Sequence, residues 1–101
     1  MHRVVVTGMG AITPLGHTAE QTWQSLVEGQ SGVADITLFD VTEFPVHVAA
    51  EVKDFDPNDY LDRREVRRPD RFEWLANVAA REAMRDSGLE ITEENSHRIG
   101  V

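Results

Sequence analysis

The chain has 101 residues, of which 41% are hydrophobic and 28% charged, a composition typical of a soluble globular protein. Its formal net charge of −8 argues against general affinity for nucleic acid, which requires a basic surface. The sequence contains no cysteine, no secretory signal and no apolar run that could cross a bilayer, so we expect a cytoplasmic protein without disulfides, thiolate metal sites or thiol catalysis in these residues.

No metal or cofactor site is predicted either. The histidines are far apart in the sequence, and none has metal-ligand spacing to a second one. We expect each of them to have a surface or structural role: His2, His17, His47 and His97.

The first predicted element is a strand over residues 3–7. Three consecutive valines without polar alternation are typical of a strand covered on both faces in a largely parallel sheet. Gly8 and Gly10 follow, and glycines after a strand invite a dinucleotide-binding interpretation. A dinucleotide-binding turn needs a third glycine at the position of Thr13, and it needs a helix that begins at the turn itself. We therefore expect these glycines to permit close backbone packing.

A helix is predicted over residues 19–28. Thr18 and Gln21 form a capping box at its start, and Gly29 is placed to end it in a left-handed conformation. Its inward face would carry three apolar side chains at helical spacing, Trp23, Leu26 and Val27.

Residues 33–45 show no clear pattern, and strand character returns over residues 46–52. Asp56 and Pro57 then predict a short helix of one or two turns that ends near Leu61, because aspartate caps a helix and proline fits its first turn.

The longest predicted helix follows Pro69 and ends at residues 87–88. Its apolar stripe consists of Phe72, Leu75, Ala76, Ala79 and Ala83, and the alanines suggest close packing against a neighbour. A new strand begins at residue 98. The order of strand, helix, strand, helices and strand indicates an α/β architecture. A chain that ends inside a strand is unusual for a complete domain, so part of a larger fold is expected.

Half of the ten basic residues fall within nine positions and give an acidic protein one positive patch: Arg63, Arg64, Arg67, Arg68 and Arg71. Such a run can be simply a solvated face. Arginine, however, binds carboxylates and phosphates through two parallel hydrogen bonds, so an acidic protein or a phosphate group is a reasonable target. In a helix, four of these side chains, Arg64, Arg67, Arg68 and Arg71, would share one side.

Several segments, in order and at the right distances, resemble the chain-elongating β-ketoacyl-acyl carrier protein synthases of type II bacterial systems. They are residues 4–16, 23–32, 39–40, 52–55, 83–89, 91–95 and 98–100, which together span essentially the whole chain. The resemblance implies a thiolase-like fold with layered αβαβα architecture, incomplete in this chain. Residues 1–101 would be the N-terminal portion of the first of two similar halves, without a second domain, in a homodimeric enzyme.

The resemblance also implies a function. Members of this family condense an acyl group with malonyl-acyl carrier protein, with loss of carbon dioxide, in fatty acid biosynthesis. Their nucleophilic cysteine and two histidines would lie beyond Val101, so no residue here takes a catalytic role and this chain alone is expected to be inactive. Basic residues before the long helix dock the acidic, phosphopantetheine-bearing acyl carrier protein, and Arg64, Arg67 and Arg68 occupy matching positions. Pro69 departs from the family pattern.

Two other interpretations remain open. The chain could belong to a non-catalytic chain-length-factor type subunit, which the residue in the cysteine's place would decide, or to a polyketide ketosynthase. It could also be a free-standing carrier-protein-binding module, which a cooperative thermal transition would support. We expect poor folding in isolation, because the valine strand and the alanine face need partners.

Overall fold

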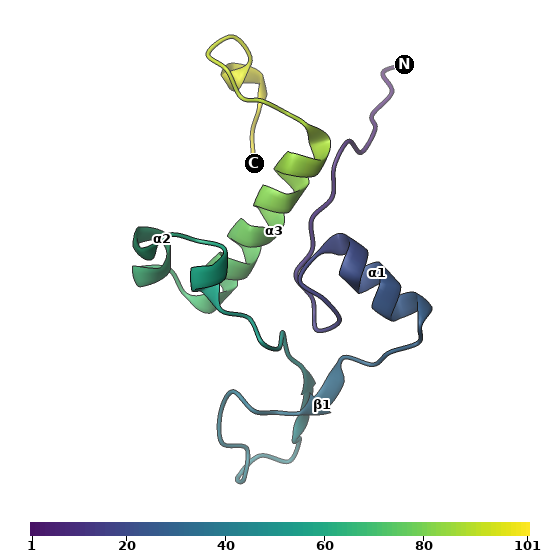
Figure 1. Cartoon of the computed structure of the whole chain (residues 1–101), viewed down its shortest axis with the longest axis vertical. Helices are drawn as coiled ribbons and strands as arrows, with labels where there is room; N and C mark the ends of the chain where they lie inside the picture. The colour runs from purple at the N-terminus through teal and green to yellow at the C-terminus, as the bar shows by residue number, and fades with distance from the viewer.

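Three α-helices and one short β-hairpin form the structure, a computed structural model that describes residues 1–101 (Figure 1). In chain order the elements are α1 (Ala19–Val27), β1 (Val33–Asp35), β2 (Val48–Ala50), the 3-10 helix η1 (Pro57–Asp59), α2 (Arg63–Arg67), α3 (Arg71–Ser87) and the 3-10 helix η2 (Ser96–Arg98). None of these helices combines the length and the apolar character needed to cross a bilayer.

Helix α1 forms where the sequence predicts it, and its two ends explain why. The Thr18 hydroxyl accepts a hydrogen bond from the Gln21 backbone N–H at 3.0 Å, and the Gln21 side chain accepts one from the His17 N–H at 3.0 Å. At the other end Gly29 has φ of 72°, which lets the Gln30 N–H reach the Ser25 carbonyl at 2.9 Å. The predicted inward face is wrong for this chain, because Trp23 is 64% exposed.

The β-hairpin pairs β1 with β2 in antiparallel register, with Val33 opposite Ala50 and Asp35 opposite Val48. Strand β2 lies inside the predicted strand over residues 46–52 but is shorter, and β1 was not predicted. Each strand has three residues, too few for an alternating pattern to stand out in the sequence. The chain therefore contains one two-stranded antiparallel sheet and no parallel sheet.

Two predicted strands are absent. Residues 3–7 form no backbone hydrogen bonds, and Val4, Val5 and Val6 are 94%, 66% and 82% exposed. Residues 98–101 pair with no strand either: Arg98 ends η2, and the N–H groups of Arg98 and Ile99 bond back to the carbonyls of Asn95 and Ser96, although the backbone of Ile99 is extended. A strand is stabilised by hydrogen bonds to a neighbouring strand, and neither of these two segments has a strand to pair with in this chain.

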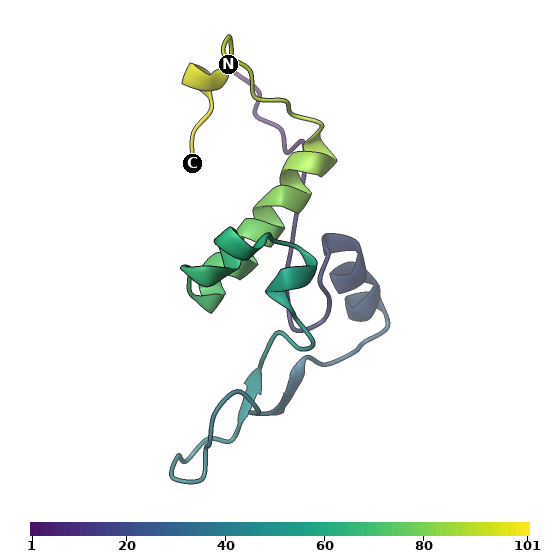
Figure 2. The same cartoon turned by 60° about the vertical axis from the view of Figure 1, so that its left-hand side comes forward.

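Instead, the residues that follow the valines pack against α3. Figures 1 and 2 both show the N-terminal segment running alongside this helix. A Cβ atom added to Gly10 would lie 2.8 Å from the backbone nitrogen of Ala83, and one added to Gly8 would lie 2.5 Å from that of Ser87. Real Cβ atoms do not approach a backbone this closely. The expected role of these glycines in close backbone packing is confirmed.

Two carboxylates of α3 hold this segment in place. Asp86 accepts a hydrogen bond from the Met9 N–H, and Glu82 accepts one from the Ala11 N–H, each at 2.9 Å. The second oxygen of Glu82 accepts from the Ala19 N–H, also at 2.9 Å. Glu82 therefore joins three elements, because it binds the N-terminal turn and the first free amide of α1 from its position on α3.

Helix α3 agrees with its predicted bounds, but its apolar stripe agrees only in part. The helix ends at Gly88, whose φ is 66°. Ala79 and Ala83 are half-buried against the N-terminal segment, whereas Phe72 is exposed. Val78, outside the predicted stripe, is 4% exposed.

The chain has almost no core of its own. Val78 and Leu61 are its only buried residues, and the radius of gyration is 17.1 Å. A compact domain of this length would have a radius of gyration of about 13 Å. Most of the apolar surface is therefore exposed.

Candidate functional site

The arginine-rich segment folds as α2, which is held at its start by a reciprocal cap. Asp62 Oδ1 accepts hydrogen bonds from the backbone N–H groups of Arg64 at 2.9 Å and Glu65 at 3.1 Å. Glu65 Oε2 in turn accepts one from the Asp62 N–H at 3.0 Å. The preceding residue, Leu61, is one of the two buried side chains. A capping box and an anchor thus fix where this short helix begins.

Three predicted site residues, Arg64, Arg67 and Arg68, lie together on α2 and at its C-terminal cap. We call their side chains the arginine surface. All three are exposed, and no carboxylate lies within 4.0 Å of their guanidinium groups, because the one ion pair in the chain joins two other residues. The arginine surface therefore presents three unpaired positive charges on a chain whose net charge is −8.

Arg71 does not belong to this surface, contrary to the expectation that it would share one side with the other three. Helix α2 ends at Arg67, and Arg71 begins the separate helix α3. Its guanidinium donates a hydrogen bond to the Val52 carbonyl at 2.7 Å. Pro69 lies between the two helices, where its missing N–H and its ring disrupt neither of them.

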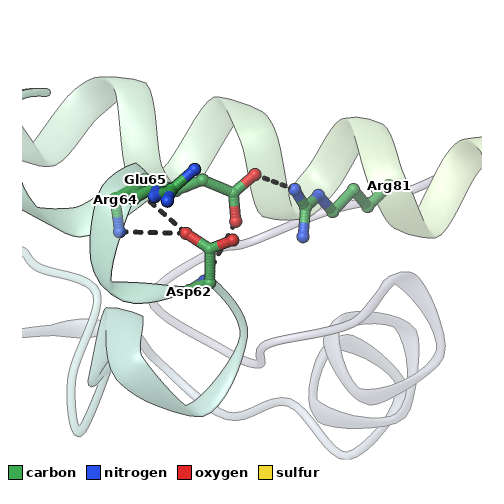
Figure 3. A network of polar contacts seen from close by, with 4 residues as sticks. All are labelled: Asp62, Arg64, Glu65 and Arg81. Carbon is green, nitrogen blue, oxygen red and sulfur yellow. Dashed lines mark hydrogen bonds and ion pairs between the residues drawn. The ribbon is translucent and has the colours of Figure 1, made fainter.

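The ion pair beside the arginine surface was not predicted. Glu65 Oε1 on α2 pairs with the Arg81 guanidinium on α3 (Figure 3). The partners are 16 residues apart, and their meeting depends on how α2 folds back on α3. No spacing rule within a single helix could have indicated it.

A hollow of about 700 Å³ lies next to the start of α3, lined by Arg71, Thr37 and residues 51–56 among others. Hydrogen bonds from the Thr37 N–H and hydroxyl hold the pKa of the Glu51 carboxyl below its ordinary value. Bonds from the Asn58 backbone and side chain do the same for the pKa of Asp56. Both carboxylates are thus ionised at neutral pH and occupied by local hydrogen bonds.

The chain has no group of three or more His, Cys, Asp or Glu side chains arranged to hold a metal ion. The feature with clear binding chemistry is the arginine surface. Guanidinium groups form paired hydrogen bonds with carboxylates and phosphates, and a cluster of unpaired cations also attracts an anionic partner over longer distances. The geometry suits recognition of an acidic surface.

Comparison with known proteins connects this geometry to a family. Residues 1–101 match the family described as "Beta-ketoacyl synthase, N-terminal domain". The proteins named 3-oxoacyl-[acyl-carrier-protein] synthase 2 from Coxiella burnetii and Vibrio harveyi are each 50% identical to the chain over 99 residues, and that from Staphylococcus aureus is 46% identical. The aligned part is 98% of this chain and 24% of each relative, so the chain spans about a quarter of their length.

A solved structure agrees with this assignment. The ishigamide ketosynthase/chain length factor superposes on 90% of this chain and 22% of its own, with a TM-score of 0.76 and 36% sequence identity. The predicted thiolase-like fold class is therefore confirmed, and the helices and hairpin described above are an incomplete part of it. With the whole sequence matched and the fold shared, the chain belongs to the β-ketoacyl synthase family, whose N-terminal domain it matches.

Proposed function

We propose that residues 1–101 are the N-terminal portion of the first half of a chain-elongating 3-oxoacyl-acyl carrier protein synthase. The identity of 46–50% to three such synthases over 98% of the chain supports this most strongly. The complete enzyme would condense an acyl group with malonyl-acyl carrier protein, with loss of carbon dioxide, in fatty acid biosynthesis. This chain contains no cysteine, so the nucleophile of that reaction would come from sequence beyond Val101.

Within that enzyme, the arginine surface would dock the acyl carrier protein. Its three guanidinium groups are exposed and lack acidic neighbours in the chain, which leaves them free for an acidic partner. Opposite charges on two proteins speed their encounter and fix their relative orientation. Exposed charges are also screened by salt, so docking through this surface would weaken as ionic strength rises.

Titration of acyl carrier protein into the full-length synthase tests this role. The variant Arg64→Glu, Arg67→Glu, Arg68→Glu should lose measurable binding at low salt, because three attractive contacts become repulsive. The wild type should bind in a salt-sensitive manner.

A matched control reverses three other exposed arginines that form no ion pair: Arg3, Arg85 and Arg98. This variant changes the net charge equally but away from α2, so its binding should stay close to that of the wild type. Equal binding by the two triple variants would contradict docking at the arginine surface.

A second candidate is a chain-length-factor type subunit without a working nucleophile. It is favoured by the likeness, at a TM-score of 0.76, to the ishigamide ketosynthase/chain length factor. The residue in the place of the family's cysteine decides between the two. A condensation assay of the full-length protein, with formation of the 3-oxoacyl product as the readout, measures the difference directly.

A free-standing carrier-protein-binding module fits the observations less well, because the chain buries two residues and exposes Trp23, Phe72 and the three valines near its start. The cytoplasmic location and the homodimer of the complete enzyme stay predictions. Sedimentation or light scattering of the full-length protein measures the oligomeric state.

A further inference from the structure

Glu65 lies within the arginine run of the sequence, yet its carboxylate contacts none of the arginines of that run. One carboxylate oxygen accepts the hydrogen bond from the Asp62 N–H at 3.0 Å, and the other pairs with Arg81 of α3 (Figure 3). Both oxygens are therefore occupied, and neither lies within 4.0 Å of the guanidinium groups of Arg64 and Arg68.

Without Arg81, this carboxylate would have another partner within reach. Arg68 follows Glu65 by three residues and keeps a right-handed helical conformation at the cap of α2, with φ of −104° and ψ of −42°. Opposite charges three residues apart on a helix attract each other. A pair between Glu65 and Arg68 would remove one of the three free charges of the arginine surface.

We propose that Arg81 is a positioning residue for docking. By binding Glu65 it keeps this carboxylate away from Arg68, so that all three guanidinium groups of the arginine surface remain available. Arg81 itself need not touch the partner. This inference rests on the proposed docking of an acidic carrier protein. It adds Arg81, which lies outside the arginine run, to the residues on which docking depends.

The test measures the Kd of acyl carrier protein for four forms of the full-length synthase at low and moderate salt: wild type, Arg81→Gln, Arg85→Gln and the double variant Glu65→Gln, Arg81→Gln. An exposed ion pair contributes modestly, so Arg81→Gln should raise the Kd roughly two- to fivefold at low salt. Arg85→Gln is the matched control, because it removes an exposed, unpaired arginine from the same helix. Its Kd should stay at the wild-type value.

The double variant separates positioning from a general loss of charge or stability. Glutamine at position 65 has no negative charge with which to mask Arg68, and its side-chain oxygen can still cap the Asp62 N–H. The double variant should therefore recover the wild-type Kd, although it lacks the ion pair. Arg81→Lys, which keeps the positive charge, should also bind like the wild type.

Two results would overturn the positioning role alone: equal Kd values for Arg81→Gln and Arg85→Gln, or a double variant that binds as weakly as Arg81→Gln. Both presuppose that the triple variant of Arg64, Arg67 and Arg68 fails to bind. If that triple variant binds like the wild type, the docking proposal itself fails, and this inference fails with it.

Discussion

The backbone of Gly10 lies directly against the backbone of Ala79 in α3, so that a methyl group on Gly10 would collide with the Ala79 carbonyl oxygen. The collision involves main-chain atoms of a helix, which cannot move aside as a flexible side chain could. The N-terminal segment can therefore lie this close to α3 only because residue 10 is a glycine. Helix α1 follows this segment directly in the chain.

Gly10→Ala in the full-length synthase should lower the free energy of unfolding by about 1–3 kcal/mol, because it forces these two backbones apart. Urea unfolding measures the change. Glu94→Ala is the control, because it changes an exposed side chain in a turn and should change stability by less than about 0.5 kcal/mol. Equal effects of the two substitutions would contradict the proposed contact.

Glu82→Ala should destabilise the same region by about 2–3 kcal/mol, because the Ala11 and Ala19 N–H groups both lose a charged acceptor. Hydrogen exchange should accelerate at these two amides in particular. Glu94→Ala removes an exposed carboxylate that accepts no hydrogen bond and serves as the control. Unchanged exchange at Ala11 and Ala19 would show that Glu82 does not hold them.

The hairpin should loosen in acid. Bonds from the Thr37 N–H and hydroxyl hold the pKa of the Glu51 carboxyl below its ordinary value of 4.5 in the folded chain. A lowered folded-state pKa gives a stabilising contribution that is present above the ordinary value and is lost as the pH falls through the lowered one. Nuclear magnetic resonance of the Thr37 amide should report this loss below pH 4.5.

The control for this prediction is Glu51→Gln, which cannot ionise. The Thr37 amide of that variant should show no such pH-dependent change. A transition of equal size in the wild type and in Glu51→Gln would assign the acid sensitivity to another group.

The 101-residue chain on its own should show no cooperative thermal transition, because Leu61 and Val78 are its only buried residues. Their burial contributes a few kcal/mol, far less than the conformational entropy of ordering a chain of this length. Differential scanning calorimetry and the dispersion of amide resonances measure this. A sharp transition with dispersed signals would support the free-standing module instead.

The features predicted most accurately from the sequence are those that depend on residues close together in the chain. The bounds of α1 and α3 follow from Thr18, Gly29 and Gly88, because a cap acts on amides or carbonyls within one turn of the chain. The close packing of Gly8 and Gly10 was also predicted correctly. The prediction of a strand over residues 3–7 was wrong, because a hydrophobic pattern leads to a strand only where another strand is present to pair with it.

By itself, then, the sequence determined α1 and α3, their ends, the family resemblance and the arginine run, since each depends on residue types at short spacing. Tertiary structure alone decided that Arg71 leaves this run for the Val52 carbonyl and that Arg81 reaches Glu65. It also decided that Glu82 holds two amides more than 60 residues away. Contacts between distant residues depend on how helices and turns are placed in space, which local propensity does not specify.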